Sequence, residues 1–160
     1  MAQKPRQSSI TLFARDLNIT WGDDKRYWNW IPVHDACSNE LVDAAELIKV
    51  CYLDARTKFD TSVLDPGTRY EVAFSLMMND NAEGWVYPVK LGFVMPNEFE
   101  DCRDVDFSKL EKNKSTEVPI GQFIAPSEDK AGKMEIYMSE TKEPWKKGMV
   151  LKGVVIRSKN

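Results

Sequence analysis

Apolar and polar residues alternate along much of this chain, and the alternation predicts a protein built from strands. The clearest run is 70–78, where every second residue from Tyr70 to Met78 is large and apolar. Side chains on a strand point to opposite faces in turn, so a period of two is typical of a strand with one face on a core. Similar runs predict strands at 10–13, 17–20, 28–33, 85–94, 119–124, 134–139 and 148–157.

Turn signals separate these runs. Asp65-Pro66-Gly67 is a strong turn, because proline and glycine favour the backbone angles that a tight turn requires. The segments 34–40, 79–84, 127–132 and 142–145 are expected to be loops or turns for similar reasons.

Two segments are harder to interpret. Residues 41–51 fit either a helix that begins after Asn39 or a strand from Leu47 to Leu53. We favour the strand, because its β-branched and aromatic residues suit a sheet. The charged segment 95–118 is predicted to be a long excursion with a helical turn near 107–110.

Many short strands with turn chemistry about every ten residues are typical of an all-β sandwich or barrel. A chain of 160 residues is long enough for one domain with a core of its own. We therefore predict one antiparallel β-sandwich of jelly-roll type over residues 9–160, preceded by a flexible tail over 1–8.

Composition and charge exclude several classes of protein. The net charge of −3 gives no global reason to bind nucleic acid. No apolar run approaches the ~20 residues that cross a bilayer, and residues 1–9 lack the apolar core of a secretory signal. We expect a cytoplasmic protein with no membrane insertion. Cys37, Cys51 and Cys102 form no CxxC pair, so reduced structural thiols are the simplest interpretation.

Catalysis has little support in the sequence. The single histidine, His34, has no identifiable partner, and no GxSxG motif is present. Asp23 and Asp24 lack the spaced oxygen ligands of a calcium loop, and turn formation explains them more simply. We expect no enzymatic activity, no cofactor and no metal.

The most unusual stretch is 14–30, where large rings flank one tight turn. Trp21 precedes Gly22-Asp23-Asp24, and Tyr27, Trp28 and Trp30 follow. One interpretation is a set of core tryptophans at two strand ends; the other is an exposed platform for a flat, partly apolar ligand.

A pyranose would fit such a platform, because it offers C–H faces to rings and hydroxyls to polar groups. Candidate rings and polar partners for it are Trp21, Tyr27, Trp28, Trp145, Asp23, Asp24, Asn29 and Glu140. On a regular strand, Trp28 and Trp30 would face the same way. Our hypothesis is that Trp28 ends the loop and is exposed, whereas Trp30 enters the core.

The same stretch resembles a known family. Ala14-Arg15-Asp16-Leu17, then Trp21, two acidic residues and Arg26-Tyr27-Trp28, are similar to the signature of the plant phloem protein 2 lectins. This family includes the tobacco leaf agglutinin group and the cucurbit phloem lectins. Met134-Glu135-Ile136 and the segment from Trp145 to Arg157 resemble the family's closing segment. The resemblance spans roughly residues 9–157.

The resemblance implies a non-catalytic jelly-roll lectin that binds N-acetylglucosamine oligomers, or chitooligosaccharides, and glycoproteins through their N-glycan cores. It also implies a homodimer, found in the cytoplasm and in phloem sieve-tube sap, with a role in plant defence. Trp21 and Trp28 match the tryptophans implicated in sugar binding, and Glu140 matches a family carboxylate near the site.

Two alternatives stay open. The first is RNA binding or transport, since basic residues gather around Trp145 at the C-terminal end. These residues are Lys142, Lys146, Lys147, Lys152, Arg157 and Lys159. The second is a structural phloem-filament subunit whose chains are joined through thiols.

Overall fold

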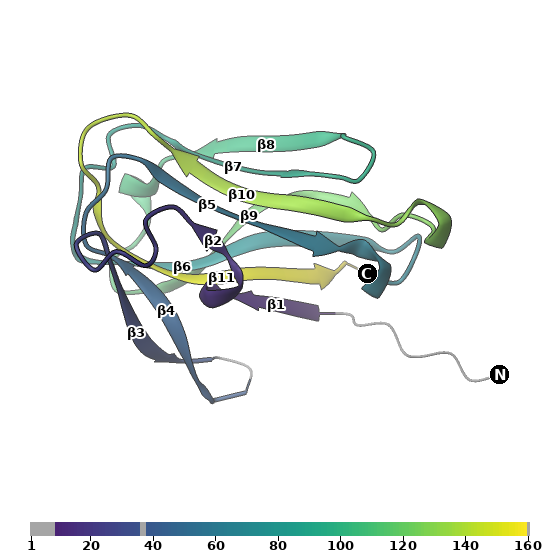
Figure 1. Ribbon diagram of the computed structural model, residues 1–160, viewed down its shortest axis with the longest axis horizontal. Helices are drawn as coiled ribbons and strands as arrows, with labels where there is room; N and C mark the ends of the chain where they lie inside the picture. The colour runs from purple at the N-terminus through teal and green to yellow at the C-terminus, as the bar shows by residue number, and fades with distance from the viewer. Residues whose placement is uncertain (1–8, 36–37, 160) are drawn as a thin grey trace.

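The computed structural model of the chain describes residues 9–35 and 38–159. Within them, eleven strands form two sheets that pack face to face (Figure 1). The strands are β1 (Ser9–Phe13), β2 (Asn18–Ile19), β3 (Trp28–His34), β4 (Leu41–Leu47), β5 (Leu53–Asp60), β6 (Arg69–Glu83), β7 (Val89–Val94), β8 (Glu100–Val105), β9 (Ser115–Ile124), β10 (Lys133–Glu140) and β11 (Lys147–Ser158). Short 3₁₀ turns, η1 (Ala14–Asp16), η2 (Thr61–Val63), η3 (Phe107–Lys109) and η4 (Glu128–Lys130), interrupt the connections.

The order of the strands identifies the topology. One sheet runs β3-β4-β11-β6-β9, with β1 also paired to β11, and the other runs β2-β5-β10-β7-β8. All of these pairs are antiparallel. When β4 to β11 are counted from one to eight, the two sheets read 1-8-3-6 and 2-7-4-5, the order of a jelly roll. The predicted antiparallel β-sandwich of jelly-roll type is confirmed.

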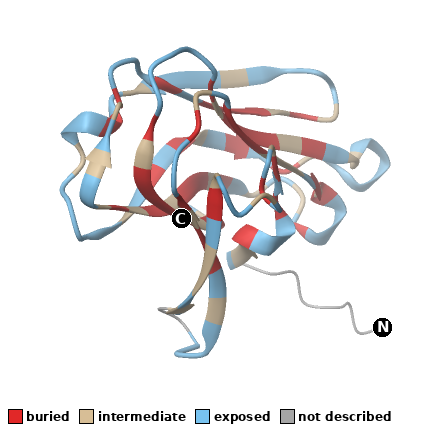
Figure 2. Ribbon diagram, turned by 60° about the vertical axis from the view of Figure 1, so that its left-hand side comes forward, coloured by how far each residue is buried: buried red, intermediate tan, exposed pale blue. Residues whose placement is uncertain are grey.

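The core lies between the two sheets, where the alternating runs place their apolar residues (Figure 2). On β6, every second residue from Tyr70 to Met78 is at most 2% exposed. On β10, Met134, Ile136 and Met138 are fully buried. The period of two therefore predicted both the strands and the faces that they bury.

The structure corrects three element predictions. The favoured strand over 47–53 is wrong, as is the helix after Asn39: β4 ends at Leu47, and 48–52 connect it to β5. Pairing with β3 and β11 holds 41–47 in a sheet although its alanines have low strand propensity. β6 also extends into the loop predicted over 79–84 and ends at Glu83.

The charged excursion over 95–118 contains β8 and the beginning of β9. β8 is an edge strand that pairs only with β7, so its charged side chains stay in water. Its sequence therefore shows no alternation of apolar and polar residues from which a strand could be predicted. The helical turn predicted near 107–110 is present as η3. The tail predicted over 1–8 and Cys37 lie outside the described residues.

Candidate functional site

Five connections lie at one end of the sandwich, at the left of Figure 1. They join β2 to β3, β4 to β5, β6 to β7, β8 to β9, and β10 to β11. Loops at the end of a rigid sandwich are common places for binding residues, because the sheets fix where each loop starts and stops. This end carries most of the residues that the sequence singled out.

Three rings from two of these loops form a surface that we call the aromatic platform: Trp21, Tyr27 and Trp145. Trp21 and Trp145 are each 55% exposed, and Tyr27 is partly buried between them. The Tyr27 ring lies 5.9 Å from Trp21 and 6.4 Å from Trp145, centroid to centroid. The Tyr27 and Trp145 planes are within 19° of parallel. The chain therefore brings together rings that lie 118 residues apart in sequence (145 − 27).

A hydrogen-bonded turn holds Trp21 outward. Its φ of +65° is a left-handed conformation that residues with a side chain seldom adopt. Gly22 N donates to Ile19 O at 2.9 Å, and Asp24 N donates to Trp21 O at 2.9 Å. The Trp30 indole N–H donates to Gly22 O at 2.9 Å and fastens the turn to β3. The exposure of Trp21 is thus fixed by the backbone around it.

The two aspartates of this turn differ in role. Asp24 accepts the Arg26 backbone N–H at 3.0 Å and pairs with the Arg26 guanidinium at 2.7 Å. The hydrogen bond from Arg26 lowers the pKa of Asp24. Asp23 is exposed, and within residues 9–35 and 38–159 its carboxylate has no hydrogen-bond or ion-pair partner. Shallow hollows of about 500 and 240 Å³ lie on either side of it. Asp23 is the carboxylate that is free to meet a ligand.

The hypothesis that Trp28 is exposed is wrong, whereas Trp30 does pack against the core, although it is only partly buried. Trp28 is 1% exposed and belongs to β3 from its first residue, where it pairs with the buried Leu47. Trp30 is partly buried, with the Arg15 guanidinium 3.7 Å from its ring centroid. Strand alternation governs both residues, so Trp28 packs in the core and offers no ring face to a ligand.

Asn29 lies on the opposite face of β3 from Trp28. Its amide donates to the Glu46 carboxylate at 3.3 Å, on the neighbouring strand β4. Asn29 is exposed, and the hydrogen-bond partner of its side chain lies within the sheet.

Glu140 is buried beneath the loop that carries Trp145. Its side chain is 4% exposed and pairs with Lys146, which is 1% exposed, at 2.8 Å. The other carboxylate oxygen accepts the Lys142 N–H at 3.0 Å. The Lys146 ammonium also donates to the carbonyls of Cys51 and Lys142, the latter at 2.8 Å. Glu140 cannot meet a ligand directly, and the pair instead ties 141–145 to the β4–β5 connection.

Sequence reasoning named Lys146 only as one of several basic residues. It missed the burial of Lys146, because lysines normally lie in water and nothing in the sequence marks this one as buried. It also missed Gly84, whose φ is +86°. A Cβ at Gly84 would lie 1.9 Å from the carbonyl oxygen of Trp145. Only glycine lets the β6–β7 connection approach Trp145 so closely. Lys49 also lies near Trp145, with its ammonium 5.8 Å from the ring centroid.

The basic residues near the C-terminus do not form a continuous unpaired surface. Lys146 is buried against Glu140, Lys147 pairs with Glu83 at 3.0 Å, and Arg157 forms an ion pair with Glu117. Neutralised cations attract phosphates weakly, so the structure gives the RNA alternative no support.

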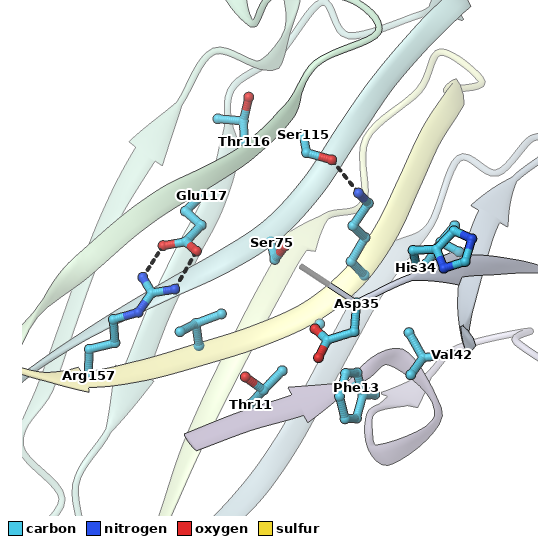
Figure 3. A pocket seen from close by; sticks show the side chains of 14 residues that line it. Thr11, Phe13, His34, Asp35, Val42, Ser75, Ser115, Thr116, Glu117 and Arg157 are labelled. Carbon is cyan, nitrogen blue, oxygen red and sulfur yellow. Dashed lines mark hydrogen bonds and ion pairs between the residues drawn. The ribbon is translucent and has the colours of Figure 1, made fainter. Parts of the chain in front are cut away.

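A third hollow, of about 330 Å³, lies between the β3–β4 hairpin and the outer face of the six-stranded sheet (Figure 3). Its cations already have partners, since Arg157 pairs with Glu117 and Lys152 donates to the Ser115 hydroxyl. His34, at the edge of this hollow, lies 3.4 Å from the Asn39 carbonyl oxygen. The rings of this hollow are the partly buried Phe13 and the imidazole of His34, whereas the platform exposes two indoles, so the hollow is less suited than the platform to a stacked ligand.

In the part of the chain that the structure describes, no group of three histidine, cysteine or acidic side chains could hold a metal ion. No helix there is long and apolar enough to span a bilayer.

Comparison with known proteins places these features in a family. The family model for Phloem protein 2 matches residues 7–158, nearly the whole chain. The chain belongs to the Phloem protein 2 family. The resemblance seen in the two end motifs is therefore confirmed.

Within the Phloem protein 2 family, the chain is 43% identical over 151 residues to phloem protein 2-like A1 of Arabidopsis thaliana. That match covers 92% of this chain but only 61% of the Arabidopsis protein. The chain is also 36% identical to a lectin of Luffa acutangula, over 92% of this chain and 69% of the lectin.

The fold extends beyond the family. A Podospora anserina GH26-CBM35 β-(1,4)-mannanase superposes with a TM-score of 0.52 at 11% identity. The superposition covers 97% of this chain and 28% of the mannanase. At this identity the likeness shows a shared sandwich fold and nothing more.

Proposed function

We propose that this Phloem protein 2 chain is a carbohydrate-binding lectin and that its aromatic platform binds N-acetylglucosamine oligomers. The observation that carries the proposal is the exposure of Trp21 and Trp145 on either side of Tyr27. Membership of a family that includes a protein named a lectin supports it. We expect the same site to bind glycoproteins through N-glycan cores.

The chemistry of the site suits a neutral sugar. The C–H face of one pyranose would lie on Trp145, the next pyranose would lie beside Tyr27 and a third would lie on Trp21, since neighbouring rings of the platform are 6.4 and 5.9 Å apart, about one sugar unit. Asp23 would accept hydroxyl or acetamido hydrogens at the edge. Asp24, Trp28 and Glu140 would act indirectly: Asp24 shapes the turn, Trp28 supports β3, and Glu140 holds the Trp145 loop.

We propose that this site binds sugars without cleaving them. Glycoside hydrolysis requires two carboxyl groups held across the scissile bond, whereas the turn beside Trp21 offers the single exposed carboxylate of Asp23. We propose a non-enzymatic binding protein, found as a homodimer in the cytoplasm and in phloem sap. A thiol-linked filament subunit is not favoured, although Cys51 and Cys102 are free and Cys102 is exposed.

Calorimetric titration with tri-N-acetylchitotriose tests the proposal. A ring that loses about 50–100 Å² of exposed apolar face on binding contributes roughly 1–2.5 kcal/mol. Trp21→Ala and Trp145→Ala should each weaken binding about tenfold. Phe99→Ala, which removes an exposed ring far from the platform, should leave the affinity unchanged. Full affinity in both tryptophan variants would overturn the assignment of the site.

A further inference from the structure

The opposite end of the sandwich contains a pocket that the platform does not explain. It has a volume of about 490 Å³ and lies among the β7–β8 connection, the end of β9 and the first residue of β6. We call it the end pocket. Its lining comprises Arg69, Met95, Pro96, Asn97, Phe99, Gln122, Phe123, Ile124, Ala125, Pro126 and Lys130. Its volume falls within the range of pockets that hold small molecules.

The floor and the mouth of the end pocket are apolar. Met95, Phe123 and Ala125 are buried members of the core. At the mouth, Phe99 is 59% exposed and Ile124 is 54% exposed. Large apolar side chains left in water each forgo roughly 1–2 kcal/mol of burial. Two of them beside one hollow indicate a surface that a further apolar group would cover.

The charge of the end pocket has a single sign. Its lining contains two cations, Arg69 and Lys130, and no carboxylate. Within residues 9–35 and 38–159, neither cation has an ion-pair partner. The chain as a whole is different: its net charge is −3, and many of its other cations are paired. Two unpaired cations beside an apolar hollow complement a ligand with one anionic group.

The polar neutral groups fit the same ligand. Gln122 supplies an amide that can donate a hydrogen bond to an anion. Asn97 is already used, since its side-chain oxygen accepts the Phe99 N–H at 3.0 Å and shapes the loop that presents the Phe99 ring. The pocket therefore offers donors and cations around an apolar surface.

We propose that the end pocket binds a small anionic amphiphile, namely a free carboxylic acid with a medium-length alkyl chain. The chain lies between Phe99 and Ile124 over Met95, and the carboxylate faces Arg69 and Lys130. This site is separate from the aromatic platform and does not depend on the sugar-binding proposal.

Titration of the full chain with decanoate, below its micellar concentration, tests the proposal by calorimetry and NMR. Decanoate should bind saturably at one site per chain and shift the amide signals of Phe99 and Ile124. Decan-1-ol, with the same chain and no charge, should bind at least tenfold more weakly. Affinity for decanoate should also fall as salt screens the cations.

Three variants complete the test. Ile124→Asp places a carboxylate in the mouth and should abolish decanoate binding, whereas the double variant Arg69→Gln/Lys130→Gln should weaken it at least fivefold. Trp145→Ala should bind decanoate normally, so the two proposals can fail separately. Chitotriose affinity unchanged by Ile124→Asp would show that this variant is folded.

Three results would overturn the proposal. The first is the absence of saturable decanoate binding. This includes the case in which a second copy of the chain covers the pocket, which would be seen as a dimer that Ile124→Asp separates into monomers. The second is equal affinity for decanoate and decan-1-ol. The third is an acidic, apolar-flanked peptide that binds where decanoate does not.

Discussion

The two ends of this sandwich expose opposite kinds of chemistry. At the platform end, rings face the solvent while the charges of Glu140 and Lys146 are buried beneath them. At the end pocket, two exposed cations that form no ion pair with any described residue lie around an apolar floor. The sheets between the two ends are the same, so the difference arises in the connections. The fold supplies fixed positions, and the loop residues decide what each end can bind.

The same contrast holds on a smaller scale between Trp21 and Trp28. They are seven residues apart, yet one is 55% exposed and the other 1% exposed. Trp21 lies in a turn at positive φ, whereas Trp28 is the first residue of a strand and faces the core. Residue type alone does not distinguish these two tryptophans. Their exposure depends on whether they lie before β3 or on it.

The largest effect should come from breaking the buried pair beneath the platform. Lys146→Met leaves the Glu140 charge buried and several carbonyls without their donor, so it should lower the free energy of unfolding by about 3–5 kcal/mol. Chitotriose binding should weaken as the Trp145 loop loosens. Urea unfolding and calorimetry measure both effects.

Lys147→Met is the matched control for that variant. Lys147 pairs with Glu83 at the surface, and such pairs contribute about 0–1 kcal/mol. A Lys146 variant that is as stable as the Lys147 variant would show that the buried pair does not support the loop.

The comparison of the two tryptophans can be tested in the same way. Trp28→Ala should cost about 3–5 kcal/mol of unfolding free energy, because it leaves a cavity in the core. Trp21→Ala should cost about 0.5 kcal/mol or less, because its ring is largely in water. Thermal unfolding of both variants measures the difference, and equal losses would contradict the structural roles assigned to them.

A smaller effect separates two glycines that share a left-handed backbone. Gly84→Ala and Gly67→Ala should each cost roughly 1–2 kcal/mol for strain at positive φ. Only Gly84→Ala adds a clash with Trp145, whereas nothing lies within 4 Å of a Cβ at Gly67. Chitotriose binding should therefore weaken in Gly84→Ala alone. Equal binding by the two variants would show that Gly84 does not position the platform.

The smallest effect concerns the turn that holds Trp21. The pKa of Asp24 is lowered by its hydrogen bond from Arg26, so its contribution to stability is complete above the unfolded value of about 3.9 and is lost as pH falls through the folded value. Asp24→Asn should lower the melting temperature slightly near neutral pH and have no effect in strong acid. A difference in melting temperature between Asp24→Asn and the unchanged chain that persists into strong acid would show that it does not come from the charge of Asp24.

Much of the fold could be predicted because its signals are local. The alternation at 70–78 and 134–139 predicted β6 and β10 and the faces that they bury. β8 was missed because an edge strand has no apolar face to reveal it, and β4 because pairing partners outweigh the low strand propensity of Ala44 and Ala45. The jelly-roll type was predicted, but the order of the strands became visible only in the pairing of the two sheets.

The site was less predictable because it is built from contacts between distant segments. The turn at 21–24 and the ring of Trp145 could be selected as candidates from residue type. The burial of Glu140 against Lys146 and the approach of Gly84 to Trp145 depend on how the connections at this end of the sandwich pack against one another. Those arrangements leave no periodic trace in the sequence.

The central claim is that the exposed tryptophans, and not the buried ones, meet the sugar. The most direct test follows the five indole N–H signals in a nitrogen-15 NMR spectrum during titration with tri-N-acetylchitotriose. We expect the Trp21 and Trp145 signals to shift with one common saturation curve while Trp28 and Trp85 stay in place. Unmoved Trp21 and Trp145 signals, at a concentration where calorimetry shows binding, would contradict the account.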